Sequence, residues 1–364
     1  MARALRLAEQ GLFTTHPNPR VGCVIVRDGE IVGEGWHQRA GEPHAEVHAL
    51  RAAGENARGA TVYVTLEPCS HYGRTPPCAN ALVEAGVGRV VAAMVDPNPL
   101  VSGKGLEILR AAGIDTESGL LEAQARALNP GFIKRMETGF PWVRVKSAMS
   151  LDGRTAMANG ESKWITGEAA RADVHRLRAR SEAIVTGIGT VLADDPSMNV
   201  RLDNAREVVQ PLRVVLDPDL MMPADAQMLS LPGDTLVLTS VGAGDDIEDL
   251  VAAGAEIRWL GGDAEHVDLA AVLKTLAELG VNEVMVEAGA TLSGAFLTAG
   301  LVDELIVYLA PHLMGDGARG LFHLPGIARM AQRIDLEISD IRSVGRDLRI
   351  TARPVLIEAT DGHG

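Results

Sequence analysis

The chain has 364 residues, 46% of them hydrophobic, which is enough for two domains that each bury a large core. Its formal net charge of −14 argues against a nucleic-acid partner, because binding to phosphates depends on Lys and Arg. Three cysteines are too few for a disulfide framework, and neither a signal peptide nor a run of about 18 apolar residues is present, so we expect a cytoplasmic protein without membrane contact.

The beginning of the chain predicts a helix over residues 2–9 followed by a β-hairpin. Residues 21–26 and 31–37 are rich in β-branched and apolar side chains, and the sequence between them, residues 27–30, contains the Asp-Gly pair that is typical of hairpin turns. Asn18 precedes the first strand, where its amide could contact the edge of a pyrimidine ring. The alternative is an Asn that only forms a turn between its two neighbouring prolines.

Three residues that follow have the side chains of a catalytic zinc site. His44, Cys69 and Cys78 could occupy three tetrahedral positions and leave the fourth to water, on which the carboxylate of Glu46 could act. H-x-E followed by P-C and a second P-C is the pattern of the zinc-dependent base deaminases. A structural zinc site usually has four protein ligands, so three ligands favour catalysis over the alternatives of a structural zinc or no zinc.

The local sequence predicts where these ligands are placed. Pro43 favours a first helical position, so we expect His44 within the first turn of a helix. Residues 61–66 predict a buried strand that delivers Cys69 at its end. Cys78 opens a second helix, where the backbone N–H groups and the helix dipole stabilise a thiolate.

The spacing of the two cysteines departs from the usual base-deaminase pattern. These enzymes commonly have C-x-x-C, whereas residues 70–77 separate Cys69 from Cys78 here. The insertion carries Arg74, which suggests a substrate with an anionic group, because guanidinium matches phosphate oxygens bidentately. The alternative is an ordinary solvated Arg.

Residues 89–94 predict another buried strand, so strands and helices alternate and the first half is expected to be a layered α/β domain. The pattern changes between residues 121 and 139, where a polar-faced helix is followed by a break. We therefore expect two domains, residues 1–138 and 139–364.

The second half also alternates between strands and helices, which predicts an α/β sheet with helices on its faces. The expected strands are residues 142–149, 183–186, 212–217, 235–239, 282–287 and 305–309, with helices notably over 167–180 and 268–279. No G-x-G-x-x-G follows the first of these strands, so a Rossmann site is not supported. Residues 287–295 form a strand end, a turn of small residues and a helix start, where N–H groups could bind a pyrophosphate, although such turns are common.

Several longer stretches resemble one known family. NPRVGCVIV, HAEVHAL, YVTLEPCSHYGRTPPC and DPNPLVSGKG resemble the deaminase half of the bifunctional riboflavin-biosynthesis deaminase/reductases. KSAMSLDGRTA, GESKWIT and TVLADDPSMNVR resemble the reductase half. The resemblance implies a cytidine-deaminase-like α/β/α domain followed by a dihydrofolate-reductase-like α/β domain. It also implies one Zn²⁺ per deaminase domain, NADPH for the reductase, and phosphoribosylated pyrimidines as substrates.

The same resemblance implies two successive reactions and the residues for them. The enzyme would deaminate a diaminopyrimidinone that carries a phosphoribosylamino group, with Glu46 moving the protons, and then reduce the ribosyl group of the product to ribityl. The implied substrate contacts are Asn18, His37, Arg74, Asp96, Asn98, Ser162, Arg178, Met198, Arg201 and Glu287. The implied cofactor contacts are Ala148, Trp164, Thr190, Asp194, Gly289, Ala290, Thr291, Leu292, Ser293, Gly294 and Ala295.

Other interpretations of single residues and of the whole chain stay open at this point. Arg178 could form an ion pair on a helix surface, Trp164 could simply pack in a core, and Lys146 could face the same cleft but is assigned no role. The chain could instead be a nucleic-acid-editing zinc deaminase with a C-terminal binding module, or a zinc-stabilised interaction protein without turnover. A homo-oligomer is expected.

Overall fold

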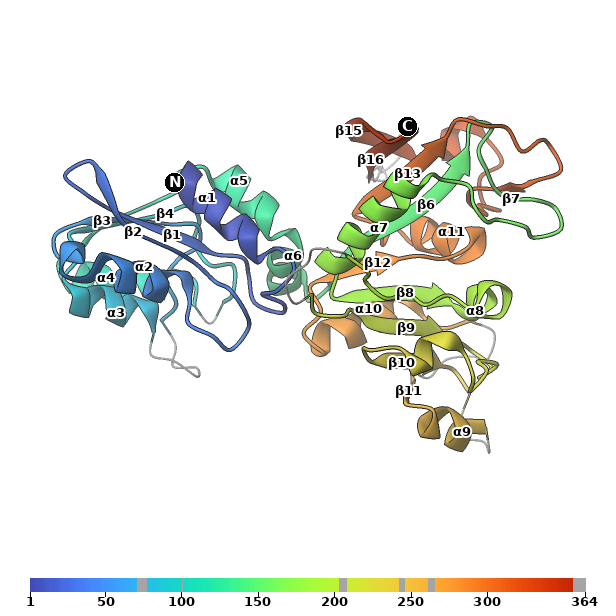
Figure 1. The fold of residues 1–364 in the computed structure, drawn as a ribbon, viewed down its shortest axis with the longest axis horizontal. Coiled ribbons are helices and arrows are strands. Elements are labelled where there is room, and N and C mark those ends of the chain that lie inside the picture. Colours follow the sequence, from blue (N-terminus) through green and yellow to red (C-terminus); the bar gives the residue numbers. More distant parts are fainter. Residues whose placement is uncertain (71–76, 100, 203–207, 242–245, 261–265, 356–364) are drawn as a thin grey trace, which may run out of the picture. The chain divides into compact units, whose positions relative to one another are not determined.

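The computed structural model describes residues 1–364 except 71–76, 100, 203–207, 242–245, 261–265 and 356–364. The chain divides into two compact units, Met1–Phe140 and Pro141–Gly364, each built on its own β-sheet (Figure 1). Within the described residues, no helix has both the length and the apolar character that a membrane crossing requires.

The first unit consists of a mixed sheet and the helices that pack on it. Its strands are β1 (Gly22–Arg27), β2 (Glu30–Trp36), β3 (Thr61–Val64), β4 (Arg89–Ala92) and β5 (Asp115–Ser118). Its helices are α1 (Ala2–Ala8), α2 (Ala45–Ala53), α3 (Cys78–Ala85), α4 (Lys104–Ala111), α5 (Glu122–Leu128) and α6 (Pro130–Thr138). In the described part of this unit, the strands form one five-stranded sheet in the order β2-β1-β3-β4-β5. The β1 strand is antiparallel to both neighbours, and β3, β4 and β5 run parallel.

Local sequence explains how this sheet is started and where its helices stop. Asp28 and Gly29 have φ angles of 52° and 86°, which is the mirror-image turn that matches the twist of a hairpin, and this confirms the predicted turn between β1 and β2. Gly86 ends α3 in the left-handed conformation, as expected. Apolar side chains of β1, β3, β4, α2 and α3 fill the core between sheet and helices.

The second unit is built on a larger, mostly parallel sheet. Its main strands are β6 (Trp142–Ser150), β8 (Ala183–Gly187), β9 (Leu212–Leu216), β10 (Thr235–Thr239), β11 (Ala255–Trp259), β12 (Glu283–Val286), β13 (Glu304–Ala310), β15 (Asp335–Val344) and β16 (Asp347–Val355). Among the residues that the structure describes, these form a nine-stranded sheet in the order β11-β10-β9-β8-β12-β6-β13-β16-β15. A short separate ladder joins β7 (Arg154–Ala156) and β14 (Arg319–Gly320).

The helices of this unit connect the parallel strands. They are α7 (Glu168–Arg180), α8 (Ile188–Asp194), α9 (Asp246–Ala252), α10 (Leu269–Glu278) and α11 (Ala290–Thr298). All six buried strands and both helices predicted for this half are present. The edge strands β11 and β15 and the neighbouring β16 were not predicted. β15 is largely exposed, and β11 and β16 mix buried, half-buried and exposed residues, so none of them has a continuous buried apolar run.

The last hairpin, β15 to β16, holds α7 in place. The Asp347 carboxylate accepts a hydrogen bond of 2.7 Å from the N–H of Gly167, the residue that caps the start of α7. Further along the helix, Asp173 accepts hydrogen bonds from the hydroxyl of Tyr308 on β13 at 2.6 Å and from Arg349 on β16 at 2.9 Å. The hairpin carboxylate therefore anchors the residue from which α7 starts.

A group of buried charges ties the centre of the same sheet together. The guanidinium of Arg144 on β6 is fully buried and binds Glu304 on β13 and Glu283 on β12, the latter at 3.4 Å. Arg180 at the end of α7 lies 3.1 Å from the same Glu283 carboxylate. Burying a charge costs several kcal/mol unless partners compensate for it, so these four side chains depend on one another.

We predict that Arg144→Met lowers the free energy of unfolding of the second unit by about 3–5 kcal/mol, because it leaves the two glutamates without their central partner. The measurement is urea denaturation, in which unfolding is monitored by hydrogen exchange of peptides from β6 and β12. Arg258→Met is the matched control, since Arg258 pairs with Glu256 at the surface and should cost less than about 1 kcal/mol. An equal effect of both substitutions would contradict the assigned role.

Candidate functional site

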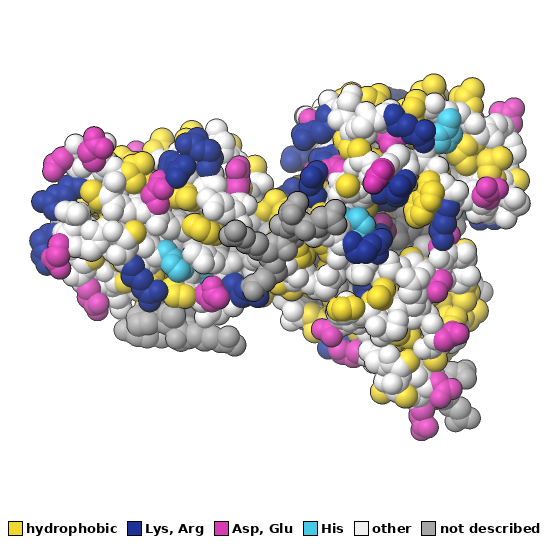
Figure 2. Space-filling view, in the orientation of Figure 1, with side chains coloured by type: hydrophobic (Ala, Val, Ile, Leu, Met, Phe, Trp, Pro, Cys, Tyr) yellow, Lys and Arg dark blue, Asp and Glu magenta, His cyan; other side chains and the backbone are white. Residues whose placement is uncertain are grey.

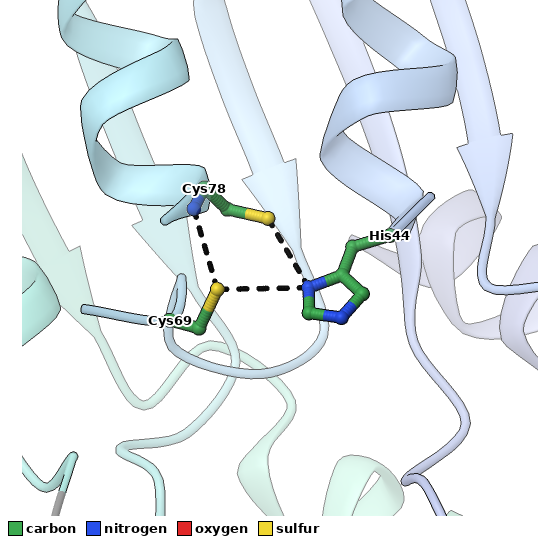
Figure 3. A group of neighbouring side chains, drawn as sticks. All are labelled: His44, Cys69 and Cys78. Carbon is green, nitrogen blue, oxygen red and sulfur yellow. Dashed lines mark hydrogen bonds between the residues drawn. The ribbon is translucent and has the colours of Figure 1, made fainter. Parts of the chain in front are cut away.

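Three side chains of the first unit come together as a possible metal centre (Figure 3). The Nδ1 atom of His44 lies 3.6 Å from Cys69 Sγ and 3.3 Å from Cys78 Sγ, and all three ligand atoms lie within 4.8 Å of one another. Cys69 comes from the segment after β3, and Cys78 is the first residue of α3. The N–H of Cys78 donates to Cys69 Sγ at 3.3 Å.

The separations and the chemistry of these atoms fit zinc. Zn–S bonds of about 2.3 Å and Zn–N bonds of about 2.1 Å at tetrahedral angles place neighbouring ligand atoms about 3.6 Å apart. Two thiols and one imidazole are common zinc ligands, and three of them leave one position of a tetrahedron to a small molecule. The predicted metal-binding residues are therefore brought together by the fold.

The start of α2 differs in detail from the prediction. The helix begins at Ala45, and His44 is the capping residue before it, with an extended backbone of φ −74° and ψ 168°. The carbonyl of His44 accepts hydrogen bonds from the N–H groups of Val47 and His48, at 3.1 and 3.3 Å. Pro43 therefore lies outside the helix and not at its first position, while Glu46 does lie in the first turn.

Glu46 is placed to move protons beside the metal centre. Its side chain is buried, and burial, followed by the negative charge of Cys69, raises the pKa of Glu46 to about 7. Its Oε2 atom has no hydrogen-bond partner in the part of the chain that the structure describes. A carboxyl group with a pKa near neutrality can both accept and donate a proton. The hydrogen bond with Cys78, more than any other contact, lowers the pKa of the Cys69 thiol to about 4, which favours the thiolate that binds metal.

A chain of hydrogen bonds places Asn18 next to the metal ligands. The Nδ1 atom of His37 faces the carbonyl of Pro43 at 3.3 Å, and its Nε2 atom lies 3.0 Å from the amide nitrogen of Asn18. Burial lowers the pKa of His37 to about 4, so the ring is neutral at pH 7, donates from Nδ1 and accepts from Asn18 at Nε2. The His37 ring also packs edge-on against His44, with 5.3 Å between ring centroids.

The other expected substrate contacts of this unit lie on a segment that Glu67 holds. The N–H of Asn98 donates to the Asp96 carboxylate at 2.8 Å, and the N–H of Asp96 donates to Glu67 at 3.0 Å. Glu67 stands two residues before Cys69 and was not predicted to have a role. The remaining predicted contact, Arg74, lies outside the described residues.

In the second unit, Arg178 and Glu287 form the centre of a buried cluster of charges. Arg178 on α7 donates two hydrogen bonds to the Glu287 carboxylate, at 2.5 and 3.0 Å, and a third to the carbonyl of Asn199 at 3.0 Å. Lys146 on β6 lies 3.6 Å from Glu287 Oε2. Arg178 is therefore not part of a surface ion pair, and Lys146, which was assigned no role, belongs to this cluster.

The positive charges around Glu287 control its protonation. Burial alone would raise the pKa of Glu287, but the charges of Arg178 and Lys146 outweigh this and lower it to about 2. The nearby His175 is kept neutral, because burial and then the charges of Arg178 and Arg201 lower its pKa to about 4. Its Nδ1 atom accepts a hydrogen bond from the backbone N–H of Arg201 at 3.3 Å.

The remaining predicted substrate contacts differ in their exposure. The Arg201 side chain is exposed and donates to Ser197 Oγ at 2.6 Å, so its guanidinium can reach a ligand, whereas that of Arg178 is already engaged. Met198 has a φ of 43° and a buried side chain in a hydrophobic core, which leaves its backbone as the part that can contact a ligand. Ser162 lies before Trp164 in the loop between β7 and α7.

Most of the predicted cofactor contacts belong to two helices, α8 and α11, and to the residue that caps α11. Helices α8 and α11 begin after β8 and β12, which are adjacent parallel strands, and the Leu292 side chain would lie 3.4 Å from a Cβ at Gly187. Thr190 and Asp194 belong to α8, and Ala148 lies on β6. Backbone N–H groups at helix starts bind phosphate oxygens.

The residues from Gly289 to Ala295 do not all face the same way. Gly289 caps α11 and has open space around its Cβ position, whereas a Cβ at Gly294 would lie 2.1 Å from the carbonyl oxygen of His323. Ser293 is likewise buried. The beginning of this turn can therefore approach a ligand, while Gly294 packs α11 against the segment around His323 and the Ser293 side chain is buried.

Trp164 is 68% exposed, so the alternative that it packs in a core is wrong. The guanidinium of Arg171 lies 4.7 Å from the centre of its ring, an arrangement in which the cation is attracted to the ring face. Lys163, the preceding residue, lies 3.8 Å from the Asp194 carboxylate. An exposed aromatic ring held from one side is suited to stack against a flat ligand.

Comparison with known families gives one match for each unit. The model described as the cytidine and deoxycytidylate deaminase zinc-binding region matches residues 1–94. The model of the RibD C-terminal domain matches residues 141–350. These matches confirm the predicted fold classes, a cytidine-deaminase-like first domain and the reductase domain of the family in the second.

Relatives match over nearly the whole chain. The riboflavin biosynthesis protein RibD of Escherichia coli is 54% identical over 358 residues, which are 96% of this chain and 96% of that protein. The solved structure of Acinetobacter baumannii RibD, form 1, is 50% identical with a TM-score of 0.91 and covers 97% of both chains. A diaminohydroxyphosphoribosylaminopyrimidine deaminase/5-amino-6-(5-phosphoribosylamino)uracil reductase from Thermotoga maritima is 32% identical, with a TM-score of 0.86 over 98% of this chain and 97% of that one.

The charge cluster around Glu287 predicts a specific pH dependence of stability. Since the pKa of Glu287 is lowered to about 2 on folding, its contribution is complete above the unfolded value of about 4.3 and is lost as the pH falls toward 2. We expect Glu287→Gln to destabilise the second unit at pH 7 by up to about 3 kcal/mol and by much less at pH 3.

Urea denaturation of both proteins at pH 7 and pH 3 measures this difference. Glu256→Gln is the control, because Glu256 is an exposed carboxylate in the same unit. A difference between Glu287→Gln and the natural protein that is the same at both pH values would contradict the predicted linkage.

Proposed function

This chain belongs to the RibD family of bifunctional riboflavin-biosynthesis enzymes, and from this premise we propose how its residues divide the work of the two reactions. The enzyme is a hydrolase, which deaminates a diaminohydroxyphosphoribosylaminopyrimidine, and an oxidoreductase, which reduces the ribosyl group of 5-amino-6-(5-phosphoribosylamino)uracil to ribityl with NADPH. The observation that carries the proposal is the centre of His44, Cys69 and Cys78 beside the buried Glu46. We assign residues 1–138 to the deaminase domain and residues 139–364 to the reductase domain.

Deamination requires a nucleophilic water and a group that moves its protons. His44, Cys69 and Cys78 would hold the zinc, and what zinc supplies there is a water acidic enough to act as a nucleophile at neutral pH. Glu46 accepts a proton and then delivers it to the exocyclic nitrogen, which leaves as ammonia. Its unpartnered Oε2 atom and its pKa near 7 support this role.

The remaining residues of the deaminase site bind and orient the substrate. Asn18 would contact the pyrimidine edge, and His37, a further substrate-contact position, fixes the direction in which the Asn18 amide points. Asp96 and Asn98 would contact the substrate from the segment that Glu67 holds. Arg74 in the insertion between the two cysteines would bind the phosphate.

In the reductase domain, we propose that one group of residues positions the sugar and that a different residue binds the phosphate. NADPH supplies a hydride, and the domain must hold the nicotinamide ring and the sugar carbon close together. Ala148, Trp164, Thr190, Asp194 and the turn from Gly289 to Ala295 would bind the cofactor. Ser162, Arg178, Met198 and Glu287 would position the sugar, and Arg201, whose side chain is exposed, is the better phosphate partner.

A nucleic-acid-editing deaminase is not favoured by the surface charge. On the face that Figure 2 shows, Lys and Arg side chains are interspersed with Asp and Glu side chains on both units. Nucleic-acid backbones require clustered basic side chains. We propose that the enzyme acts on small phosphoribosylated pyrimidines and has neither nucleic-acid nor membrane partners. We further propose that it works in the cytoplasm as a homo-oligomer; its cysteines are free, as expected in a reducing compartment.

We predict that Glu46→Gln lowers kcat for deamination by about 10³-fold or more and leaves the zinc content unchanged, because the amide cannot take up a proton. Ammonia release from the pyrimidine nucleotide measures kcat, and elemental analysis measures zinc. Glu42→Gln, which alters an exposed neighbour, should retain full activity. Deamination by Glu46→Gln at the natural rate would remove Glu46 from the mechanism.

Removal of zinc should separate the two activities. We expect a strong chelator, or the substitution Cys69→Ala, to abolish ammonia release while NADPH oxidation with the deaminated product continues at its natural rate. The reason is that the metal ligands all lie in the first unit. If both activities were lost together, zinc would serve the stability of the whole chain and would not be specific to deamination.

A further inference from the structure

Glu67 has an unusual set of partners for a side chain that was not predicted to act. It is 3% exposed, and its carboxylate accepts hydrogen bonds from four backbone N–H groups. Oε2 accepts from Asp96 at 3.0 Å and Gly103 at 2.9 Å, and Oε1 accepts from Gly105 at 2.8 Å and Leu106 at 3.3 Å. All four donors belong to the segment that leads from β4 into α4.

Two glycines make this arrangement possible. Gly103 caps α4 but has no side chain, so the carboxylate of Glu67 takes the place of a local cap for the first N–H groups of the helix. A Cβ at Gly105 would lie 1.9 Å from the carbonyl oxygen of Pro68 and 3.2 Å from Glu67 Oε1. Only glycine lets the start of α4 come this close to the chain just before Cys69.

The contacts continue from Glu67 toward both sides of the deaminase site. On one side, Cys69 follows two residues later, and the backbone N–H of Glu67 donates to the carbonyl of Met94 on the neighbouring segment at 3.0 Å. On the other side, the Asp96 whose N–H binds Glu67 uses its own carboxylate to bind the N–H of Asn98 at 2.8 Å. The metal ligand and the two expected substrate contacts are thus joined through one carboxylate.

We propose that Glu67 is a positioning residue of the deaminase, which sets Asp96 and Asn98 at a fixed distance from the metal centre and thereby controls the binding of the pyrimidine substrate. This inference rests on the proposed function, because the substrate contacts of Asp96 and Asn98 are part of that proposal. Both oxygens of the Glu67 carboxylate already accept from backbone N–H groups, so Glu67 would act through Asp96 and Asn98. A misplacement of about 1 Å at such contacts is enough to impair an enzyme substantially.

The substitution Glu67→Gln tests this proposal with little change of shape. Glutamine keeps one acceptor oxygen but turns an NH₂ group toward two backbone N–H donors, so the segment from Asp96 to Pro99 is released from its position. We expect KM for deamination to rise at least tenfold, with one zinc per chain retained and with unchanged reductase kinetics. Hydrogen exchange at the amides of Asp96, Gly103 and Gly105 should accelerate. Glu55→Gln, at an exposed position of the same unit, is the matched control.

A second variant keeps the carboxylate and removes the close approach. Gly105→Ala places a methyl group against the carbonyl of Pro68 and should push the start of α4 away from Glu67. We expect the same rise in KM. If Glu67→Gln loses zinc or fails to fold, Gly105→Ala decides between positioning and a purely structural role.

Variants of the substrate contacts distinguish a failure of the role inferred for Glu67 from a failure of the proposed substrate contacts. Asp96→Ala and Asn98→Ala should raise KM if the proposed substrate contacts are right. If they do so, but Glu67→Gln and Gly105→Ala are folded, zinc-loaded and within twofold of the natural KM, the inference about Glu67 is overturned and the proposed function stands. If hydrogen exchange accelerates in Glu67→Gln but none of the four variants alters KM, the proposed substrate contacts are wrong, and the positioning role falls with them.

Discussion

A buried charged side chain loses its hydration, and opposite charges or hydrogen bonds inside the protein must offset this cost. The sites of both units are built around such side chains. Glu287 is held by Arg178 and Lys146, Arg144 by two glutamates, and Glu67 by four backbone N–H groups. Each of these groups connects segments that are distant in sequence. The geometry of the sites therefore depends on the ion pairs and hydrogen bonds of these buried groups as much as on the apolar cores.

The buried carboxylates of the two units have different kinds of partners. In the first unit, the four described partners of the buried Glu67 carboxylate are backbone donors, so they depend on the path of the chain and on glycine at position 105. In the second unit, Glu287 uses the side-chain cations of Arg178 and Lys146. Burial keeps the nearby His175 neutral, and the charge of Arg178 adds to this effect. The first arrangement depends on Glu67 and on the path of the backbone, whereas the second can be altered by a substitution of any of its side-chain partners.

The sequence was sufficient to predict those structural features that depend on short-range patterns of residues. The hairpin turn at Asp28 and Gly29, the parallel strands of the second unit and the ligand set of His44, Cys69 and Cys78 all follow from local residue types and spacing. The edge strand β15 was missed, because an exposed strand has no apolar face to reveal it. Glu67, Lys146 and His175 were missed for another reason: their roles depend on partners about 30 to 140 residues away, which no local pattern records. The Glu-Pro-Cys triplet was the one available signal for Glu67, since a buried strand end leaves an acidic side chain in need of donors.

The hydrogen bond between Asp347 and the residue that precedes α7 has a consequence for how the protein is made. The first unit, with its metal ligands, leaves the ribosome long before the second is finished. The start of the helix that carries Arg178 emerges 180 residues ahead of the carboxylate that secures it. Until the final hairpin leaves the exit tunnel, this helix lacks both Asp347 and the Arg349 partner of Asp173. A nascent chain can thus hold a completed deaminase while its reductase is still waiting for the last strands of its sheet.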